Sequence, residues 1–420
     1  NQLQARDPFN TVAPQPFRRD QFGGSLGGPV RRNRTFFLFN YEGSRQAQNV
    51  TRVATVPPDA FWKGDLSSLL ARGIQLRDPL GSGRPVIPNN RLDEYLGGAR
   101  ISKTALKLQP FWGSPNQPGA ANNRVSFGQE TSNRDQFTIR GDQMLPRSQS
   151  LALRYTNSTS GGLSPSILAN GTGVRTPTDT RNAGLTWTAP FGARTVSEFR
   201  FGYANYTSLT SYEDGGLPTV ASLGLKGFEK FNEGIPPMVR ISFSGNDAFT
   251  QLNYGSTASY GMAALRRISD TWTWSEALTH MRGKHAFKAG FEIRRTLLDA
   301  LQQTNASGQL TFRASTGATS TGYTFGDFLM GLPSSTQEVP VKPPVLLKQS
   351  EIASYVQDDW RVTPRLTLSL GLRHELQLSP YEDRNRLAMF DLYTGAIIVA
   401  SDNGKLPSDQ FLPSIVSKLT

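Results

Sequence analysis

The chain has 420 residues, of which 37% are hydrophobic and 10% aromatic, and its net charge is +12. It contains no cysteine, which excludes a disulfide framework and a thiolate metal site. Mean hydropathy is −0.40, and no run approaches the roughly 20 consecutive apolar residues that a membrane-spanning helix needs. These values leave a membrane β-barrel open, because its strands need only about ten residues of alternating polarity.

The positive charge could indicate a nucleic-acid partner. The basic residues are scattered along the chain, however, and several lie in short turns. We therefore expect no nucleic-acid partner. The chain begins at Asn1 without a signal peptide, and we interpret it as a fragment or a processed chain.

The first 20 residues are polar and rich in turn formers, and we interpret them as the remnant of an extracellular loop. A first strand hairpin is predicted at 21–43, with its turn at 31–34. Residues 44–133 lack sustained alternation and are predicted to form one long loop with a short helix-like stretch near 102–108. A second hairpin follows at 134–157, around the turn 145–149.

Three more hairpins follow in the second half of the chain. They are predicted at 181–207, 267–296 and 350–377, with short turns at 189–194, about 280–284, and 362–365. The loops between them are 158–180, 208–266 and 297–349, and the last has a possible helical turn at 325–330.

The clearest strand pattern lies in the last hairpin, at 355–375. Leu366, Leu368, Leu370 and Leu372 occupy every other position, and polar residues or glycine fill the positions between. A period of two is that of a β-strand with one aliphatic face and one polar face.

Short and long connections alternate strictly along the chain. Up-and-down outer-membrane barrels have tight periplasmic turns and long extracellular loops, whereas a Greek-key sandwich would mix the two lengths. The predicted fold class is therefore all-β, an antiparallel up-and-down transmembrane β-barrel with roughly ten strands in this chain.

Several blocks of the sequence resemble the TonB-dependent receptor family, specifically its Oar-like branch. The blocks are FRRDQFGGSLGGPVRRNRTFFLFNYEG (17–43), RDQFTIR (134–140), EFRFGY (198–203), KHAFKAGFEIR (284–294), FGDFLMGLP (325–333) and the hairpin 355–375. The resemblance implies a 22-strand barrel filled by a plug domain, of which this chain would be about half, with the plug absent from it.

The same resemblance implies the partners and the location. They are outer-membrane lipid, the protein's own plug domain, the TonB energy-transducing complex and an unknown extracellular ligand, in the bacterial outer membrane. The favoured function is uptake of a ligand, with no catalysis and no cofactor. Two alternatives stay open, namely a passive porin or structural surface barrel, and a secreted soluble all-β binding protein or glycan-active enzyme.

Two sets of candidate functional residues follow from the alternation. Charged residues on the polar faces are predicted to face the lumen and the plug: Arg140, Arg154, Arg200, Lys288, Glu292, Arg294, Arg373 and Glu375. Aromatic residues on the opposite faces are predicted to form an interfacial girdle at headgroup depth: Tyr155, Trp187, Tyr203, Trp272, Trp274 and Trp360.

We expect no catalytic or metal-binding role for three weaker motifs. Residues 23–27 match the G-x-S-x-G pattern of a hydrolase, but no helix is expected after them, so we expect close packing of neighbouring backbone. His280 and His285 flank one turn, yet zinc normally needs three protein ligands, and we predict no metal site. Asp358 and Asp359 should point to opposite faces and are not expected to act as an acid/base pair.

Overall fold

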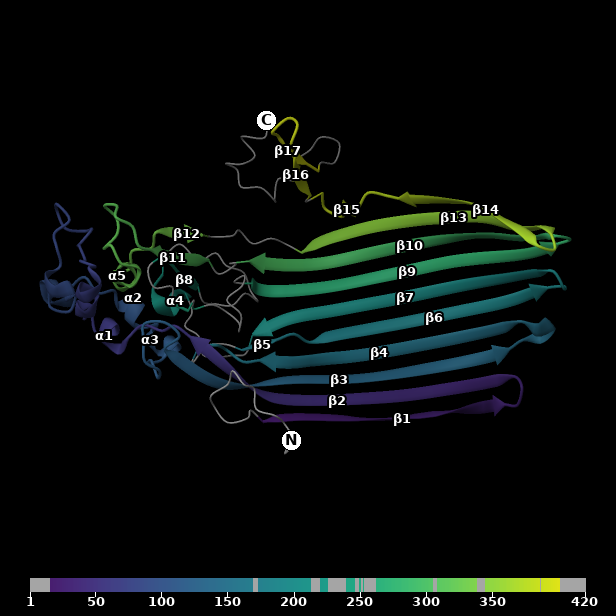
Figure 1. The fold of residues 1–420 in the computed structure, drawn as a ribbon, viewed down its shortest axis with the longest axis horizontal. Helices are drawn as coiled ribbons and strands as arrows, with labels where there is room; N and C mark the ends of the chain where they lie inside the picture. The colour runs from purple at the N-terminus through teal and green to yellow at the C-terminus, as the bar shows by residue number, and fades with distance from the viewer. Residues whose placement is uncertain are drawn as a thin grey trace.

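A computed structural model of the chain describes residues 16–168, 173–212, 220–225, 239–245, 249–250, 252, 262–304, 308–337, 344–385 and 387–400. One large antiparallel sheet dominates this part of the chain, and a folded loop region adjoins one end of the sheet (Figure 1). Within the described residues no helix is long and apolar enough to cross a membrane.

The sheet follows the order of the chain, each long strand pairing antiparallel with the next long strand. Its ten long strands in the described part are β1 (Phe17–Arg31), β2 (Thr35–Ala54), β3 (Arg124–Met144), β4 (Ser150–Ser164), β6 (Thr178–Phe191), β7 (Thr195–Tyr212), β9 (Met262–Arg282), β10 (His285–Thr304), β13 (Val345–Thr363) and β14 (Leu366–Gln377). Two short strands, β5 (Val174–Arg175) and β15 (Tyr381–Glu382), add to it. The predicted all-β, antiparallel, up-and-down class is confirmed.

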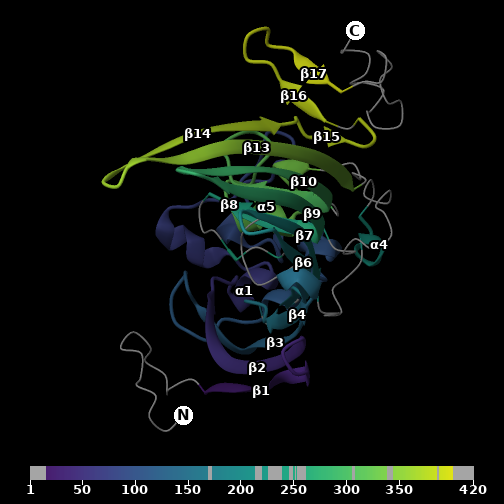
Figure 2. The same ribbon diagram turned by 90° about the vertical axis from the view of Figure 1, so that its right-hand side faces the viewer.

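The five short turns lie together at one end of the sheet, and the long connections lie at the other (Figure 1). Viewed from the end that carries the turns, the sheet curves through an open arc from β1 to β14 (Figure 2). This curvature follows from the right-handed twist of neighbouring strands, and it gives the sheet two distinct faces.

Several strands extend further toward the long connections than the sequence pattern indicates. β2 runs to Ala54 and β3 begins at Arg124, and their register continues without a shift to the pair formed by these two residues. The added segments carry little apolar alternation, so the pattern could not predict them. Backbone hydrogen bonds to the neighbouring strand define a strand there.

The central part of the long loop predicted at 44–133 folds into several short helices. This part contains helices α1 (Asp59–Trp62), α2 (Lys103–Leu106) and α3 (Gln109–Trp112) and three 3₁₀ helices at Ser67–Arg72, Pro88–Asn90 and Tyr95–Gly98. The stretch expected near 102–108 corresponds to α2, and Ser102 caps it by accepting a hydrogen bond from the Ala105 N–H at 3.3 Å.

The other long connections supply the remaining elements of the loop region. They are α4 (Val220–Leu223), α5 (Thr324–Leu329) and a small sheet in the order β12 (Ser335–Gln337), β11 (Gln309–Arg313), β8 (Arg240–Ser244). The helical turn expected at 325–330 corresponds to α5. A 3₁₀ helix (Pro146–Ser148) and a hairpin of β16 (Ala388–Phe390) and β17 (Ile397–Val399) complete the described elements.

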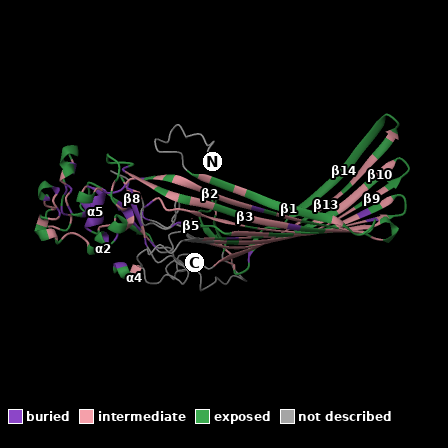
Figure 3. Cartoon of the chain, turned by 90° about the horizontal axis from the view of Figure 1, so that it is seen from below, coloured by how far each residue is buried: buried purple, intermediate pink, exposed green. Residues whose placement is uncertain are grey.

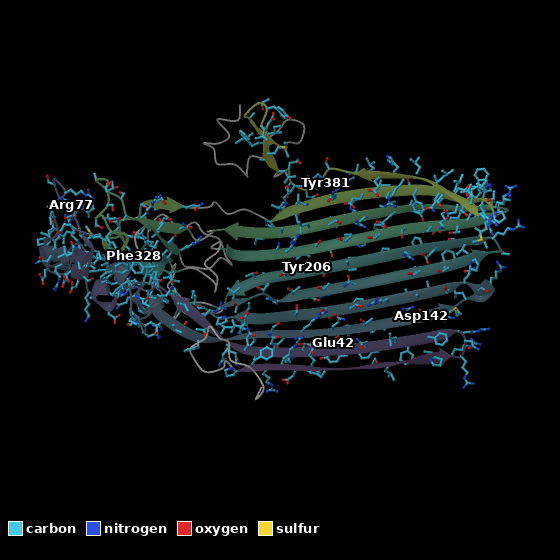
Figure 4. All side chains as sticks on the ribbon, in the orientation of Figure 1. Glu42, Arg77, Asp142, Tyr206, Phe328 and Tyr381 are labelled. Carbon is cyan, nitrogen blue, oxygen red and sulfur yellow. The ribbon has the colours of Figure 1, made fainter. Side chains whose placement is uncertain are left out.

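Almost all buried apolar side chains of the described residues belong to this loop region (Figure 3). The long strands, by contrast, are mostly exposed or half-buried. We call the buried aromatic group the loop core: Phe61, Trp62, Trp112, Phe243, Phe249, Phe312, Tyr323, Phe325 and Phe328. Phe328 lies inside the loop region, whereas Glu42 and Asp142 lie on the sheet (Figure 4).

The loop core joins three connections that are distant in sequence. The ring of Trp62 lies 5.7 Å from that of Trp112 and 5.0 Å from that of Phe325, the latter edge-on. Phe328 lies 5.3 Å from Phe243 of β8 and 5.2 Å from Phe312 of β11. Edge-to-face contacts at these distances stabilise aromatic pairs beyond their buried area.

We predict that Phe328→Ala will loosen the whole loop region, because the ring contacts every connection that forms the core. Removing a buried phenylalanine costs about 3–5 kcal/mol. Hydrogen exchange of residues 56–112 in the full-length protein should rise sharply. The control Leu96→Ala, at a side chain that is 59% exposed, should leave exchange unchanged, and an equal rise in both variants would contradict the prediction.

Candidate functional site

The register of the sheet decides which side chains share a face. Directly paired residues of antiparallel strands point to the same side, and alternate residues of one strand do so as well. One row of paired residues runs across six strands: Arg140, Arg154, Gly184, Gly202, Thr273 and Arg294. From Arg294 the row continues through Glu351 to Gln377.

Each of the eight predicted lumen residues belongs to this row or lies an even number of positions from it along its strand. All eight therefore lie on one face, which we call the charged face. Salt bridges run along it, most of them between residues two apart on one strand. The pairs include Arg140 and Asp142 (2.8 Å), Arg200 and Glu198 (2.5 Å), Lys288 and Asp359 (3.2 Å), and Arg294 with Glu292 (2.9 Å) and Glu351 (3.2 Å).

Arg373 pairs with Glu375 on β14 in the same way. The face is thus densely charged and internally paired, and these pairs are exposed, so each adds little to the free energy of unfolding. A shallow groove crosses β10, β13 and β14 on this side, lined among others by Glu292, Arg294, Arg373 and Glu375. That this face contacts a plug stays a prediction.

The six predicted girdle residues share the opposite face, which we call the aromatic face. Tyr203 and Trp272 pair directly, with ring centroids 5.5 Å apart. Trp187 and Trp360 lie within four residues of short turns, whereas Trp272 lies ten residues from the end of β9 at Arg282. The register brings the six to one face, and their depth in a bilayer stays a prediction.

Polar clusters on the aromatic face were not predicted from the sequence. The Tyr41 hydroxyl donates to Asp135 at 2.6 Å, and Arg45 pairs with the same carboxylate at 2.8 Å. The Tyr203 hydroxyl likewise donates to Asp270 at 2.7 Å. These groups lie well inside their strands, and only the cross-strand register brings them together.

The weaker motifs acquire definite partners in the structure. Residues 23–27 lie inside β1, and a Cβ on Gly23 would lie 2.3 Å from the Tyr41 carbonyl oxygen. His280 shares a hydrogen bond with Thr195 (2.8 Å), and His285 with Asp358 (2.6 Å). Among the residues that the structure describes, no three His, Cys, Asp or Glu side chains converge as a metal site would require.

Buried polar residues hold the loop region in shape. Asn123 closes the base of the first long connection, accepting from the Val56 N–H and donating to the Val56 carbonyl, both at 2.8 Å. Asp78 is fully buried and accepts from Arg100 at 2.9 Å and from the Tyr95 hydroxyl at 3.2 Å. Satisfied buried groups of this kind specify one packing arrangement.

Asp327 of α5 is a titratable group within this region. It is 2% exposed and accepts hydrogen bonds of 2.6 Å from the Ser320 hydroxyl and the Thr321 N–H. Burial is the largest influence and raises the pKa of the Asp327 carboxyl, and the two hydrogen bonds oppose it in part.

Comparison with known proteins places the chain in a family. The family described as "Outer membrane beta barrel domain" matches residues 1–415. The chain belongs to this family. The sheet is accordingly part of a barrel of the bacterial outer membrane, whose long loops are extracellular and whose short turns are periplasmic. No curated protein matches the chain.

Several solved outer-membrane proteins align with the chain at low identity. The transporter YddB from Escherichia coli aligns with 9% identity and a TM-score of 0.42, over 88% of this chain and 34% of its own. The alcaligin receptor FauA from Bordetella pertussis aligns with 8% identity and a TM-score of 0.37, over 91% and 48%. The ferric enterobactin receptor PfeA from Pseudomonas aeruginosa aligns with 13% identity and a TM-score of 0.35, over 88% of this chain and 37% of its own. The chain thus spans a third to a half of these proteins.

We predict that nitroxide labels on single cysteines will distinguish the two faces of β14 in the full-length barrel. Labels at Leu368 and Leu370 should be accessible to oxygen dissolved in lipid, because both residues lie on the aromatic face. Labels at Ser369 and Gly371 should not. Reversed accessibility would overturn the assignment of lipid and lumen faces.

We predict a pH dependence of the loop region that comes from Asp327. A raised pKa in the folded state means that folding favours the protonated carboxyl. The stabilisation is complete below the unfolded pKa, close to 3.8, and is lost as pH rises through the folded pKa. Hydrogen exchange of residues 320–330, corrected for intrinsic rates, should therefore increase above pH 4. Asp327→Asn should remove this dependence, and an unchanged dependence would assign it to another group.

Proposed function

We propose that this chain is part of a TonB-dependent receptor of the Oar-like branch, which takes up an extracellular ligand across the outer membrane without catalysis of its own. The family match supports a membrane barrel over the secreted soluble alternative. The observation that favours a receptor is the loop core, because it gives the extracellular end of the sheet a folded surface.

A passive pore needs only an open lumen, and its loops need no shared core. Here Trp62 and Trp112 of the first long connection pack on Phe328 of α5 and Phe243 of β8. Phe328 in turn packs on Phe312 of β11. Ligand binding is favoured by surfaces that are rigid before the ligand arrives, since less entropy is lost on binding. The loop region fits this role.

The charged face supports a plugged barrel over a water-filled one. It carries side chains of both signs on most strands of the sheet, including Arg154, which forms no ion pair with any residue that the structure describes. Such a face offers donors and acceptors to a protein domain inside the lumen. The ligand itself is not specified by these features.

Liposome swelling tests the proposal in the full-length protein. With a plug in place, vesicles containing the protein should exclude both arabinose and stachyose and should not swell. The purified periplasmic domain of TonB should also bind the detergent-solubilised protein. Rapid swelling in arabinose together with no binding of TonB would assign the chain to a passive porin instead.

A further inference from the structure

The five short turns form a strongly basic band at one end of the sheet, which we call the turn rim: residues 31–34, 145–149, 192–194, 282–284 and 361–365. It contains nine basic residues and no acidic residue: Arg31, Arg32, Arg34, Arg147, Arg194, Arg282, Lys284, Arg361 and Arg365. The rest of the chain has 36 basic and 33 acidic residues. The turn rim thus supplies nine of the twelve net positive charges.

All nine side chains are exposed, and none forms an ion pair with any residue that the structure describes. Basic residues elsewhere are often neutralised. Arg91 contacts Asp93 at 2.6 Å and Glu94 at 3.0 Å in the loop region, and Arg100 contacts Asp78. The turn rim therefore differs from the rest of the chain in its pairing as well as in its composition.

Backbone hydrogen bonds join three of the four pairs of neighbouring turns, and the pairing of β4 with β6 places the second turn beside the third. The Met144 N–H donates to the Arg34 carbonyl at 2.6 Å, and the Met281 N–H donates to the Arg194 carbonyl at 2.8 Å. The Arg361 N–H donates to the Lys284 carbonyl at 2.8 Å. The basic side chains accordingly extend from fixed positions along the perimeter of the sheet.

The turn rim begins where the aromatic face ends. Trp360 lies three residues before the end of β13, and Phe287 and Leu368 lie two residues inside β10 and β14. Trp187 also donates a hydrogen bond of 3.2 Å to Gln149 of the turn rim. Tryptophan at the edge of an apolar face marks the level of lipid headgroups, so the basic residues lie at or just beyond that level.

We propose that the turn rim binds the phosphate groups of anionic phospholipids in the periplasmic leaflet. Guanidinium groups bind phosphate oxygens in a bidentate manner, and basic residues beside a membrane surface attract anionic lipids. The inference uses the membrane orientation of the barrel and is independent of the proposed transport function.

The composition of the turn rim favours lipid over a protein partner. The centre of a protein interface is built around exposed apolar or aromatic residues, and none of the large apolar residues of the turn rim is exposed, since Leu145 and Val362 are half-buried. A perimeter of separate positive charges beside an apolar face suits many small headgroups.

Fluorescence quenching in vesicles tests this proposal. The full-length protein, with a fluorophore on Ala193→Cys as its sole cysteine, is reconstituted in phosphatidylcholine with a minor fraction of phosphatidylglycerol. Quenching by brominated phosphatidylglycerol should show that this lipid is enriched about threefold or more around the turn rim. The enrichment should fall as salt rises from 0.01 M to 1 M, since the Debye length falls from about 30 Å to about 3 Å.

The variant R147Q/R282Q/R365Q should lose most of this enrichment. Its control R19Q/K63Q/K103Q removes the same charge from exposed residues outside the turn rim, whose side chains have no hydrogen-bond partner among the described residues, and it should keep the enrichment. Equal quenching by brominated phosphatidylcholine and phosphatidylglycerol in the unmodified protein would overturn the proposal. An equal loss in both triple variants would overturn it too, as would binding of a soluble peptidoglycan fragment at the turn rim without any preference among lipids.

Discussion

The antiparallel backbone ladder is the constraint on which the rest of this structure depends. In a bilayer every backbone donor and acceptor must be satisfied within the protein, and the eight inner long strands of the described sheet achieve this by pairing with a neighbour on each side. The ladder also fixes the register, and the register assigns each side chain to the charged face or the aromatic face. A shift of one residue in any strand would exchange its two faces, so the backbone pairing and the side-chain pattern must agree.

The sheet and the loop region are stabilised in different ways. The sheet has few buried side chains among the described residues, because the packed core lies in the loop region. The loop region has a packed aromatic core of its own, held by buried polar groups such as Asn123 and Asp78. A rigid extracellular surface on a membrane-embedded sheet suits capture of a ligand outside the cell. The short turns at the other, periplasmic end of the sheet carry most of the net positive charge of the chain.

Much of the sheet could be predicted from the sequence. Alternation in 366–372 predicts a strand whose two faces differ, and the alternation of short and long connections predicts an up-and-down topology. The two sets of candidate residues separate by face in the structure as the parity of their positions requires. The loop core could not be predicted in this way, because Trp62, Trp112, Phe243 and Phe328 come from separate connections with no common period.

The sequence by itself determined the fold class, which connections are short turns and which are long, and which strand residues share a side of the sheet. It could do so because a period of two is a local property of the chain. Tertiary structure alone decided the ends of the strands, the folded state of the long connections and the pairing of Tyr41 and Arg45 with Asp135. Those features depend on contacts between residues that are distant in sequence, such as Ala54 with Arg124 and Tyr41 with Asp135. The charge of the turn rim was visible in the sequence, but only the sheet shows that five separate turns form one continuous band.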